Sequence, residues 1–539
     1  MQHSFIRFLF LCAAMALATN TAYSADPAAP APAREIKISD TQFVRGGQTP
    51  AWIRESPIPA TTKTQPAVTR LADTQFRIDK NELTYVRRVI QVNDSSALAQ
   101  IGQLQLDFAP EYSKLHLLSL RILRGTQVID LTKTVDVRFL QREAKLENGT
   151  YSGTVTASLV LNDVRVGDTM DLRYMTEGAN PVFGGKFSDW ASWDQPNPTE
   201  LRSIIVSHPV NRSLKWQGVS DLREFTAKPE ITERNGYRYL EWTVQDLDVV
   251  DFETYMPEDY LPVRVMQFSE YKDWNAVARW ADALFPEVKS LPPELNALVS
   301  EISKLPDQKA RAAAALRWVQ EEIRYFSVSF GESSHRPHPP AEVLKQRFGD
   351  CKDKSYLLTT LLHRLGIEAQ PMLVSLRTPR TPVRLLPMPT VFDHAIVHAR
   401  IDGSDYYLDG TRLGQRGQLD KIGPTLEGAY GLIVAPDTQA LKQITNPNIK
   451  ALSTISLSED IKLAGFGDTG TLQSVQRWRG NYAEAMRLAF AQITANQIRQ
   501  YALSNYELRY ANIALTGDPQ INDDKEANEI SMTATFTIP

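Results

Sequence analysis

The hydrophobic pattern of the chain changes near Asp251, and this change divides the chain into regions that must fold differently. Before that point, short runs rich in β-branched residues alternate between apolar and polar positions, as strands do. After it, apolar residues recur at helical spacing. The chain has 539 residues, whereas a single domain usually holds about 100–200. We therefore expect a multidomain protein, with an all-β domain followed by an α+β domain.

The region from about 36 to 255 is predicted to be a β-sandwich. Turn signals such as Asn148-Gly149 separate its apolar runs, and short strands at this spacing are typical of antiparallel sandwiches. We find no catalytic constellation in this region. Its predicted strands are 84–92, 103–108, 115–123, 154–161, 169–174, 203–206 and 239–244.

The first 24 residues have the features of a secretory signal peptide. Arg7 precedes an apolar run at 8–18, and small residues at 22–24 form a cleavage pattern. The run is shorter than the ~20 apolar residues that span a bilayer, although an uncleaved membrane anchor remains the alternative. Residues 25–35 are rich in Pro and Ala and predict an extended linker. We therefore expect a periplasmic or secreted protein, without a transmembrane segment after cleavage.

The sequence contains two cysteines, Cys12 and Cys351, which excludes a disulfide scaffold and cysteine-based zinc or iron–sulfur sites. Cys12 lies within the predicted signal peptide, so cleavage leaves Cys351 as a lone thiol in an oxidising compartment. Such a thiol must be either deeply buried or chemically used, because exposed thiols oxidise there.

Cys351 is predicted to begin a helix. Asp350 is positioned to cap that helix, and Gly366 is positioned to end it. Backbone N–H groups and the dipole at a helix start favour a thiolate, the nucleophilic form of cysteine, and can also receive an oxyanion. A structural cysteine would more naturally lie on the apolar face of the helix, so we interpret Cys351 as a nucleophile. That face is formed by Leu357, Leu358, Leu361, Leu362 and Leu365.

A base and an orienting carboxylate follow in the predicted strands 392–401 and 406–409. If Asp402-Gly403 forms a two-residue turn, Asp409 lies on the same face as His394 and within its reach. A three-residue loop would place the carboxylate on the opposite face. The two-residue turn therefore predicts the nucleophile, base and orienter of covalent catalysis.

Five sequence pieces follow one another in the middle of the chain. They are Ile323-Arg324-Tyr325, the loop through Pro339, GDCKDKSYLLTTLLHRLGIEA at 349–369, Phe392-Asp393-His394 and Tyr407-Leu408-Asp409-Gly410-Thr411. With these pieces, the segment from about 265 to 434 resembles the transglutaminase-like superfamily of papain-type cysteine enzymes. The resemblance implies an α+β domain at 260–440 with Cys351 as nucleophile, His394 as general base and Asp409 as the orienting residue. Tyr325 is a candidate second donor to the oxyanion, and a packed core tyrosine is the alternative.

One position departs from the family pattern, because Gly410 stands where the family usually has proline after the aspartate. The preceding region, 36–255, resembles the domain of unknown function that commonly precedes such domains in bacterial envelope proteins. The remaining region, 450–539, is predicted to be β-rich, with strands at 470–477, 507–515 and 530–538 and a helix at 481–504. The last strand pattern continues to the end of the sequence, so we expect an incomplete domain or a longer natural chain.

The charge of the chain and the positions of its histidines indicate which partners and ions the protein is not expected to bind. The formal net charge is −4 and no Lys/Arg tract occurs, so we expect no nucleic-acid partner. His335 and His338 lie in a proline-rich loop without an acidic ligand at fixed spacing, so we expect no metal site. No calcium loop is present, and the expected chemistry needs no cofactor.

We therefore expect acyl transfer or hydrolysis at an amide or peptide bond of a protein or peptide substrate, with the cell envelope as one source of that substrate. Water is the default acceptor, as in a protease or amidase, unless a dry site favours an amine. Two other classes of function remain as alternatives to an enzyme. One is a catalytically silent envelope scaffold, and the other is a redox sensor that uses Cys351.

Overall fold

The computed structural model describes residues 34–539, except 142–149, 152, 223–224, 226, 252, 254, 258 and 447–452. The predicted signal peptide, with Cys12, and most of the predicted linker lie outside the described residues. The last two linker residues are strand β1 (Arg34–Glu35), which pairs with β8 (Asp136–Gln141). The last two residues of the linker expected at 25–35 therefore belong to a sheet.

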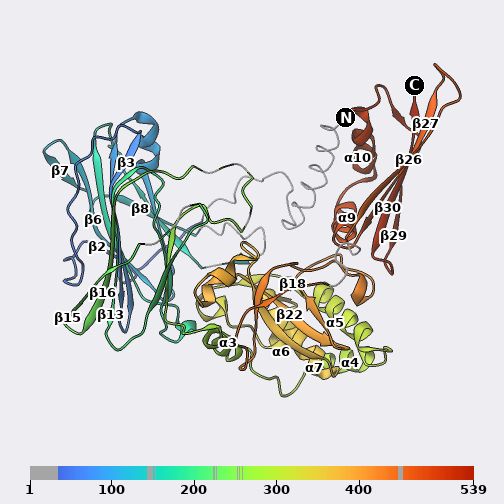
Figure 1. Ribbon diagram of the computed structural model, residues 1–539, viewed down its shortest axis with the longest axis horizontal. Coiled ribbons are helices and arrows are strands. Elements are labelled where there is room, and N and C mark those ends of the chain that lie inside the picture. The colour runs from blue at the N-terminus through green and yellow to red at the C-terminus, as the bar shows by residue number, and fades with distance from the viewer. Residues whose placement is uncertain are drawn as a thin grey trace.

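The N-terminal region is built on a nine-stranded sheet with the order β15-β16-β13-β3-β4-β11-β6-β2, in which β7 also pairs with β6 (Figure 1). Neighbouring strands are antiparallel except for the pairs β13–β3 and β2–β6. The strands are β2 (Phe43–Arg45), β3 (Ala67–Ile78), β4 (Glu82–Val92), β6 (Lys114–Arg124), β7 (Gln127–Asp130), β11 (Thr169–Glu177), β13 (Thr199–Pro209), β15 (Glu230–Arg234) and β16 (Tyr237–Leu247).

Two smaller sheets pack against this large sheet. A four-stranded sheet, β1-β8-β10-β5, shares a hydrophobic core with β6 and β11 and contains β5 (Gln103–Phe108) and β10 (Val155–Val160). A three-stranded sheet shares a core with β3, β13 and β16. Its strands are β12 (Ser188–Ser192), β17 (Val265–Ser269) and β14 (Lys215–Val219).

Strand β17 places the end of the N-terminal region at about Ser269, beyond the boundary expected at 255 and inside the domain expected to begin at 260. The reason is burial, since Met266 and Phe268 are fully buried against Phe76 and Trp242 of the large sheet. The strands that pair with β17 are distant in sequence, so no local pattern marks this end.

The central region combines helices with a five-stranded sheet of order β23-β22-β21-β24-β25. Helix α7 (Cys351–Arg364) packs against β21 (Glu368–Val374), β22 (His394–Ile401) and α5 (Gln308–Glu322), with its leucines fully buried between them. The other elements are α3 (Trp274–Asp282), α4 (Pro293–Ile302), β18 (Arg324–Tyr325), β19 (Ser327–Val328), α6 (Pro340–Gln346), β20 (Phe348–Gly349), β23 (Ser404–Leu408), β24 (Tyr430–Ile433) and β25 (Lys442–Gln443).

The C-terminal module, residues 453–539, is a five-stranded sheet with two helices, drawn in red in Figure 1. Two predictions are wrong here. The single helix expected at 481–504 is divided into α9 (Asn481–Gln492) and α10 (Ala495–Glu507), because Ile493 is extended and Thr494 starts a new capping box. The strand expected at 507–515 is only β28 (Ala514–Leu515), since Glu507 still belongs to α10. The other strands are β26 (Ile455–Lys462), β27 (Gly470–Arg479), β29 (Gln520–Asp524) and β30 (Glu529–Ile538).

Strand β9 (Thr150–Tyr151) of the N-terminal region pairs in parallel with β19, which joins that region to the central one. Within the described part of the chain, none of the helices combines the length and the apolar character that a membrane crossing would need.

Candidate active site

Cys351 is the first residue of α7, and a capping box fixes this helix start. The side chain of Asp350 accepts the backbone N–H groups of Lys352 and Asp353 at 3.1 and 3.3 Å. In return, Oδ2 of Asp353 accepts the backbone N–H of Asp350 at 3.1 Å. This reciprocal arrangement determines where the helix begins, so the thiol lies at its N-terminal end. The expected capping role of Asp350 is confirmed.

The hairpin between β22 and β23 positions the histidine and the aspartate. Ile401 pairs with Ser404 across the turn, and both turn residues have positive φ, 50° for Asp402 and 77° for Gly403. This is the geometry of a two-residue hairpin turn, so the predicted register is confirmed. Asp409 follows β23 directly, on the side of the hairpin where His394 lies.

His394 and Asp409 form a buried pair. The distance between His394 Nε2 and Asp409 Oδ2 is 3.0 Å, and the two residues are only 8% and 6% exposed. The other carboxylate oxygen, Oδ1, accepts the backbone N–H and the hydroxyl of Thr411 at 2.8 and 2.7 Å. Both oxygens of the carboxylate are therefore engaged, which fixes the plane of the group against the imidazole.

The contact between His394 and Asp409 changes the pKa of both side chains. Burial lowers the pKa of His394, but the charge and hydrogen bond of Asp409, together with Cys351, raise this pKa well above its ordinary value. Burial likewise raises the pKa of Asp409, but His394 and the donors of Thr411 outweigh it and lower that pKa below its ordinary value. The pair therefore favours an imidazolium beside a carboxylate.

The thiol, the imidazole and the start of α7 meet in a cavity of about 380 Å³. Cys351 and His394 both line this cavity, and the thiol is near enough to contribute to the raised pKa of His394. The structure thus brings together the three residues that the sequence singled out. Aromatic and apolar side chains form much of the wall, among them Trp280, Leu284, Phe285 and Phe392.

The groups available to an oxyanion are fewer than expected. Because Asp350 occupies the N–H groups of Lys352 and Asp353, the first-turn amide left without a partner, among the described residues, is that of Cys351. Tyr325 lines the cavity and is 36% exposed, so it does not lie in the packed core. The carboxylate of Asp350 is used by the helix cap, by Lys352 and by Ser327, which makes it a support of the helix start.

Two lysines, Lys352 and Lys354, lie in the first turn of α7 beside the thiol, and the protein engages both of them. Lys352 is buried and ion-paired with Asp350, so its charge is balanced locally. Burial lowers the pKa of this lysine, but Asp350 and Asp353 raise it above its ordinary value. Lys354 turns inward instead, and its Nζ donates to the backbone oxygen of Ile323.

Sequence reasoning missed the place of His335 in the cavity wall. Its ring packs on Trp280 and Phe183 at centroid distances of 5.5 and 5.0 Å. Burial, with a smaller effect of Lys352, lowers the pKa of His335 to about 4, so the ring is neutral at pH 7. His338 instead bonds Asp353, through its backbone N–H at 2.7 Å. The available signal was the Pro/His-rich loop directly before the cysteine motif.

A second histidine–carboxylate pair lies on the same two strands. His398 Nε2 is 2.8 Å from Oδ1 of Asp405, and Lys442 pairs with the same carboxylate. His398 does not line the cavity that contains Cys351. It therefore provides a matched reference for the His394–Asp409 pair. The described residues contain no group of three or more His, Cys, Asp or Glu side chains placed to bind a metal ion.

Two family models match the chain. The model of a domain of unknown function, DUF3857, matches residues 79–250, within the N-terminal β-rich region. The model of the transglutaminase-like superfamily matches residues 296–408. Cys351 and His394 lie within this second match, and Asp409 directly follows its last residue.

Solved structures are similar to the chain in fold. A candidate protease from Parabacteroides distasonis matches with a TM-score of 0.56 at 12% identity, over 88% of this chain and 94% of that one. A candidate cysteine protease from Cytophaga hutchinsonii matches with a TM-score of 0.20 at 15% identity, over 42% of this chain and 79% of that one. The likeness in overall fold therefore rests on the first. No curated protein matches the sequence. The chain therefore contains a segment that matches DUF3857, followed by a segment that matches the transglutaminase-like core.

Proposed function

We propose that this chain is an exported cysteine enzyme that cleaves an amide or peptide bond in a protein or peptide substrate. One observation carries the proposal: His394, held by the Asp409 carboxylate, and Cys351 line the same cavity, which is large enough for substrate groups. Cys351 is the nucleophile, His394 the general base and acid, and Asp409 the residue that orients the imidazole. Export rests on the N-terminal sequence pattern.

In the first step, the Cys351 thiolate attacks the carbonyl carbon of the substrate. The carbonyl oxygen becomes an oxyanion, which the free N–H of Cys351 receives at the helix start, with Tyr325 as a second donor. The imidazolium of His394 then gives its proton to the departing amine. The C–N bond breaks, and the acyl group remains on sulfur as a thioester.

In the second step, water attacks the thioester while neutral His394 takes a proton from it. The C–S bond breaks, a carboxylic acid leaves, and the thiolate–imidazolium pair is restored. An amine in place of water would form a new amide, as in transamidation. Hydrolysis is the default outcome because water is the more abundant acceptor.

The proposal is tested by alkylation of purified mature protein with iodoacetamide across pH. Because the structure favours an imidazolium at His394, Cys351 should react rapidly at about pH 6, where an ordinary thiol of pKa about 8.5 is slow. The variant His394→Ala should lose this low-pH reactivity. His398→Gln, which disrupts the matched pair on the same strands, should retain it.

An ordinary thiol profile that is unchanged in His394→Ala would remove the enzymatic assignment and leave the silent scaffold. Low-pH reactivity without turnover of peptides or cell-wall fragments would instead favour the redox sensor. Export is tested separately, by recovering the protein from the periplasmic fraction and sequencing its N-terminus, which should begin at Ala25.

A further inference from the structure

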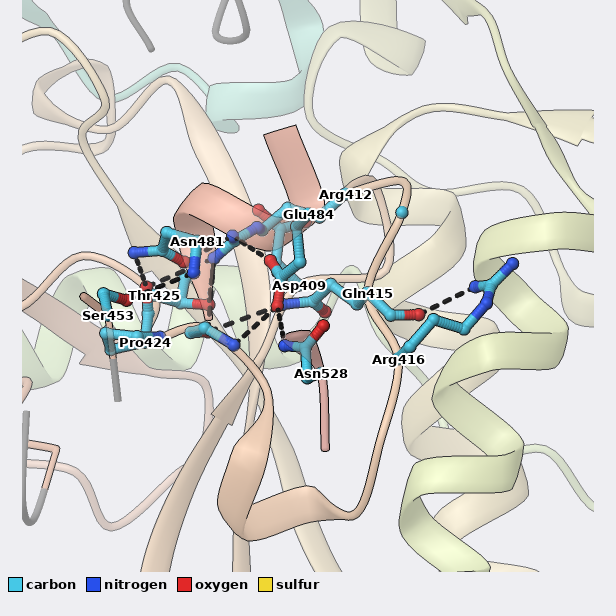
Figure 2. Close-up of polar contacts among 12 residues, drawn as sticks. Asp409, Arg412, Gln415, Arg416, Pro424, Thr425, Ser453, Asn481, Glu484 and Asn528 are labelled. Carbon is cyan, nitrogen blue, oxygen red and sulfur yellow. Dashed lines mark hydrogen bonds and ion pairs between the residues drawn. The ribbon is translucent and has the colours of Figure 1, made fainter. Parts of the chain in front are cut away.

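The loop that follows Asp409, residues 410–425, is fitted closely to the C-terminal module (Figure 2). A Cβ at Gly414 would lie 2.8 Å from the backbone oxygen of Glu484, and one at Gly423 would lie 1.9 Å from Oδ1 of Asn481. No side chain fits at either position without movement of the module. Arg487 of α9 adds a hydrogen bond of 2.5 Å to the backbone oxygen of Gly414. The loop and the module therefore pack as one unit.

Glu484 of α9 lies at the centre of this contact and is 2% exposed. Its Oε1 accepts the backbone N–H of Gly423 at 2.6 Å and the amide of Asn528 at 2.9 Å. Its Oε2 accepts Arg412 at 2.5 Å and the amide of Gln415 at 3.3 Å (Figure 2). A buried carboxylate is stable only when such donors satisfy it, so the loop conformation and the charge of Glu484 depend on each other.

A buried hydrogen-bond path leads from Glu484 to Asp409. Gln415, which donates to Glu484, accepts the amide of Gln320 at 2.7 Å. The same amide group of Gln320 donates to the backbone oxygen of Asp409 at 2.9 Å. Gln320 and Gln415 are both buried, so water does not easily replace these bonds. The side chain of Asp409 then bonds His394.

We propose that Glu484 is a positioning residue for the candidate active site. Through the loop and the two glutamines, the C-terminal module holds Asp409, and with it His394, in the orientation that Cys351 requires. This inference rests on the function proposed above. The reaction rate at the site is sensitive to small movements of these side chains, because a misplacement of about 1 Å at reacting groups costs on the order of 100-fold in rate.

The test uses the full mature chain with Glu484→Gln. This variant keeps the side-chain volume but replaces one carboxylate oxygen by an NH₂ group, a donor that faces other donors. Alkylation of Cys351 at about pH 6 should slow by roughly tenfold, and the rate profile should move toward that of an ordinary thiol. The control is Glu459→Gln, which breaks the pair with Arg509 elsewhere in the module and should change nothing. Arg412→Lys, a milder change at the same carboxylate, replaces Glu484→Gln if that variant does not fold.

A double-mutant cycle separates positioning from general destabilisation. Gln320→Leu removes the hydrogen bonds of the path next to Asp409. Its effect on the alkylation rate of Cys351 and the effect of Glu484→Gln should therefore be less than additive when the two are combined. Gln320→Leu with Glu459→Gln should show only the effect of Gln320→Leu. Full additivity of the first pair would overturn the proposal.

A spectroscopic readout distinguishes failure of this proposal from failure of the function. In protein with ¹⁵N-labelled histidine, the His394 signal is assigned by its loss in His394→Ala, and its pH titration should shift in Glu484→Gln. If wild-type Cys351 reacts as an ordinary thiol, the proposed function fails, yet a shifted His394 titration still supports the positioning path. If the His394 titration and the alkylation profile are both unchanged in Glu484→Gln, the positioning role is wrong.

Discussion

At the scale of single residues, the environment of Asp409 requires a carboxylate and not merely an acceptor of the right shape. Thr411 directs two donors at Oδ1, and His394 faces Oδ2. An amide in this position must turn its NH₂ group either toward the donors of Thr411 or toward the N–H of His394. Neither orientation satisfies all the hydrogen bonds, although the two side chains have the same size.

We therefore predict that Asp409→Asn lowers peptide turnover by up to roughly 10⁴-fold, the loss seen when the orienting aspartate of a serine-protease triad becomes an asparagine. The matched control is Asp405→Asn, which changes the partner of His398 on the same hairpin and should leave turnover intact. Steady-state kinetics on one peptide substrate measure both. Wild-type turnover in Asp409→Asn would show that His394 needs no anionic partner.

At the scale of elements, the features that the sequence predicted well are those set by local chemistry. The leucine stripe and the capping residue defined α7, and the Asp402-Gly403 turn defined the register of β22 and β23. Strand β3 was not predicted, because nearly all of its residues are buried and the polar–apolar alternation of a half-buried strand is absent. The end of the N-terminal region was missed for a related reason, since β17 pairs with strands far away in sequence.

The same distinction holds in the site. The three chemistry-bearing residues follow from a helix start and a hairpin, both of which are local. The position of His335 in the cavity wall and the path from Glu484 to Asp409 depend on contacts between regions far apart in the chain, and no sequence spacing indicates them.

The dependence of the site on one turn can be tested by an insertion. One glycine added after Gly403 makes a three-residue loop, which shifts the register by one residue and turns Asp409 to the opposite face of the hairpin. We expect low-pH alkylation of Cys351 to fall to the level of an ordinary thiol. The control is the same insertion after Gly236, in a turn where Asn235 and Gly236 also have positive φ and join β15 to β16. Equal losses from both insertions would contradict the local explanation.

At the scale of the whole molecule, the modules on both sides of the central region hold parts of the candidate site. The C-terminal module holds the loop after Asp409, whereas the N-terminal region holds the opposite wall of the cavity. Asn180 of the N-terminal region donates to the backbone oxygen of Gly331 at 2.9 Å and to the hydroxyl of Ser334 at 3.0 Å. Ser334 in turn bonds His335 at 2.8 Å, and both residues line the cavity.

This arrangement predicts that the N-terminal region affects substrate binding more than the reactivity of the thiol. Asn180→Ala removes both bonds to the cavity wall, which at about 1 kcal/mol each corresponds to a rise of up to roughly 30-fold in KM for a peptide. Alkylation of Cys351 by the small reagent iodoacetamide should keep its wild-type profile, because Asn180 bonds Gly331, Ser334 and Val182, which lie outside α7 and β22. Asn180→Asp keeps the acceptor that caps Val182 but loses both donors, so it should raise KM as Asn180→Ala does. An altered alkylation profile with unchanged KM would instead show that Asn180 supports the thiol. The separate roles assigned to the N-terminal region and the C-terminal module would then be wrong.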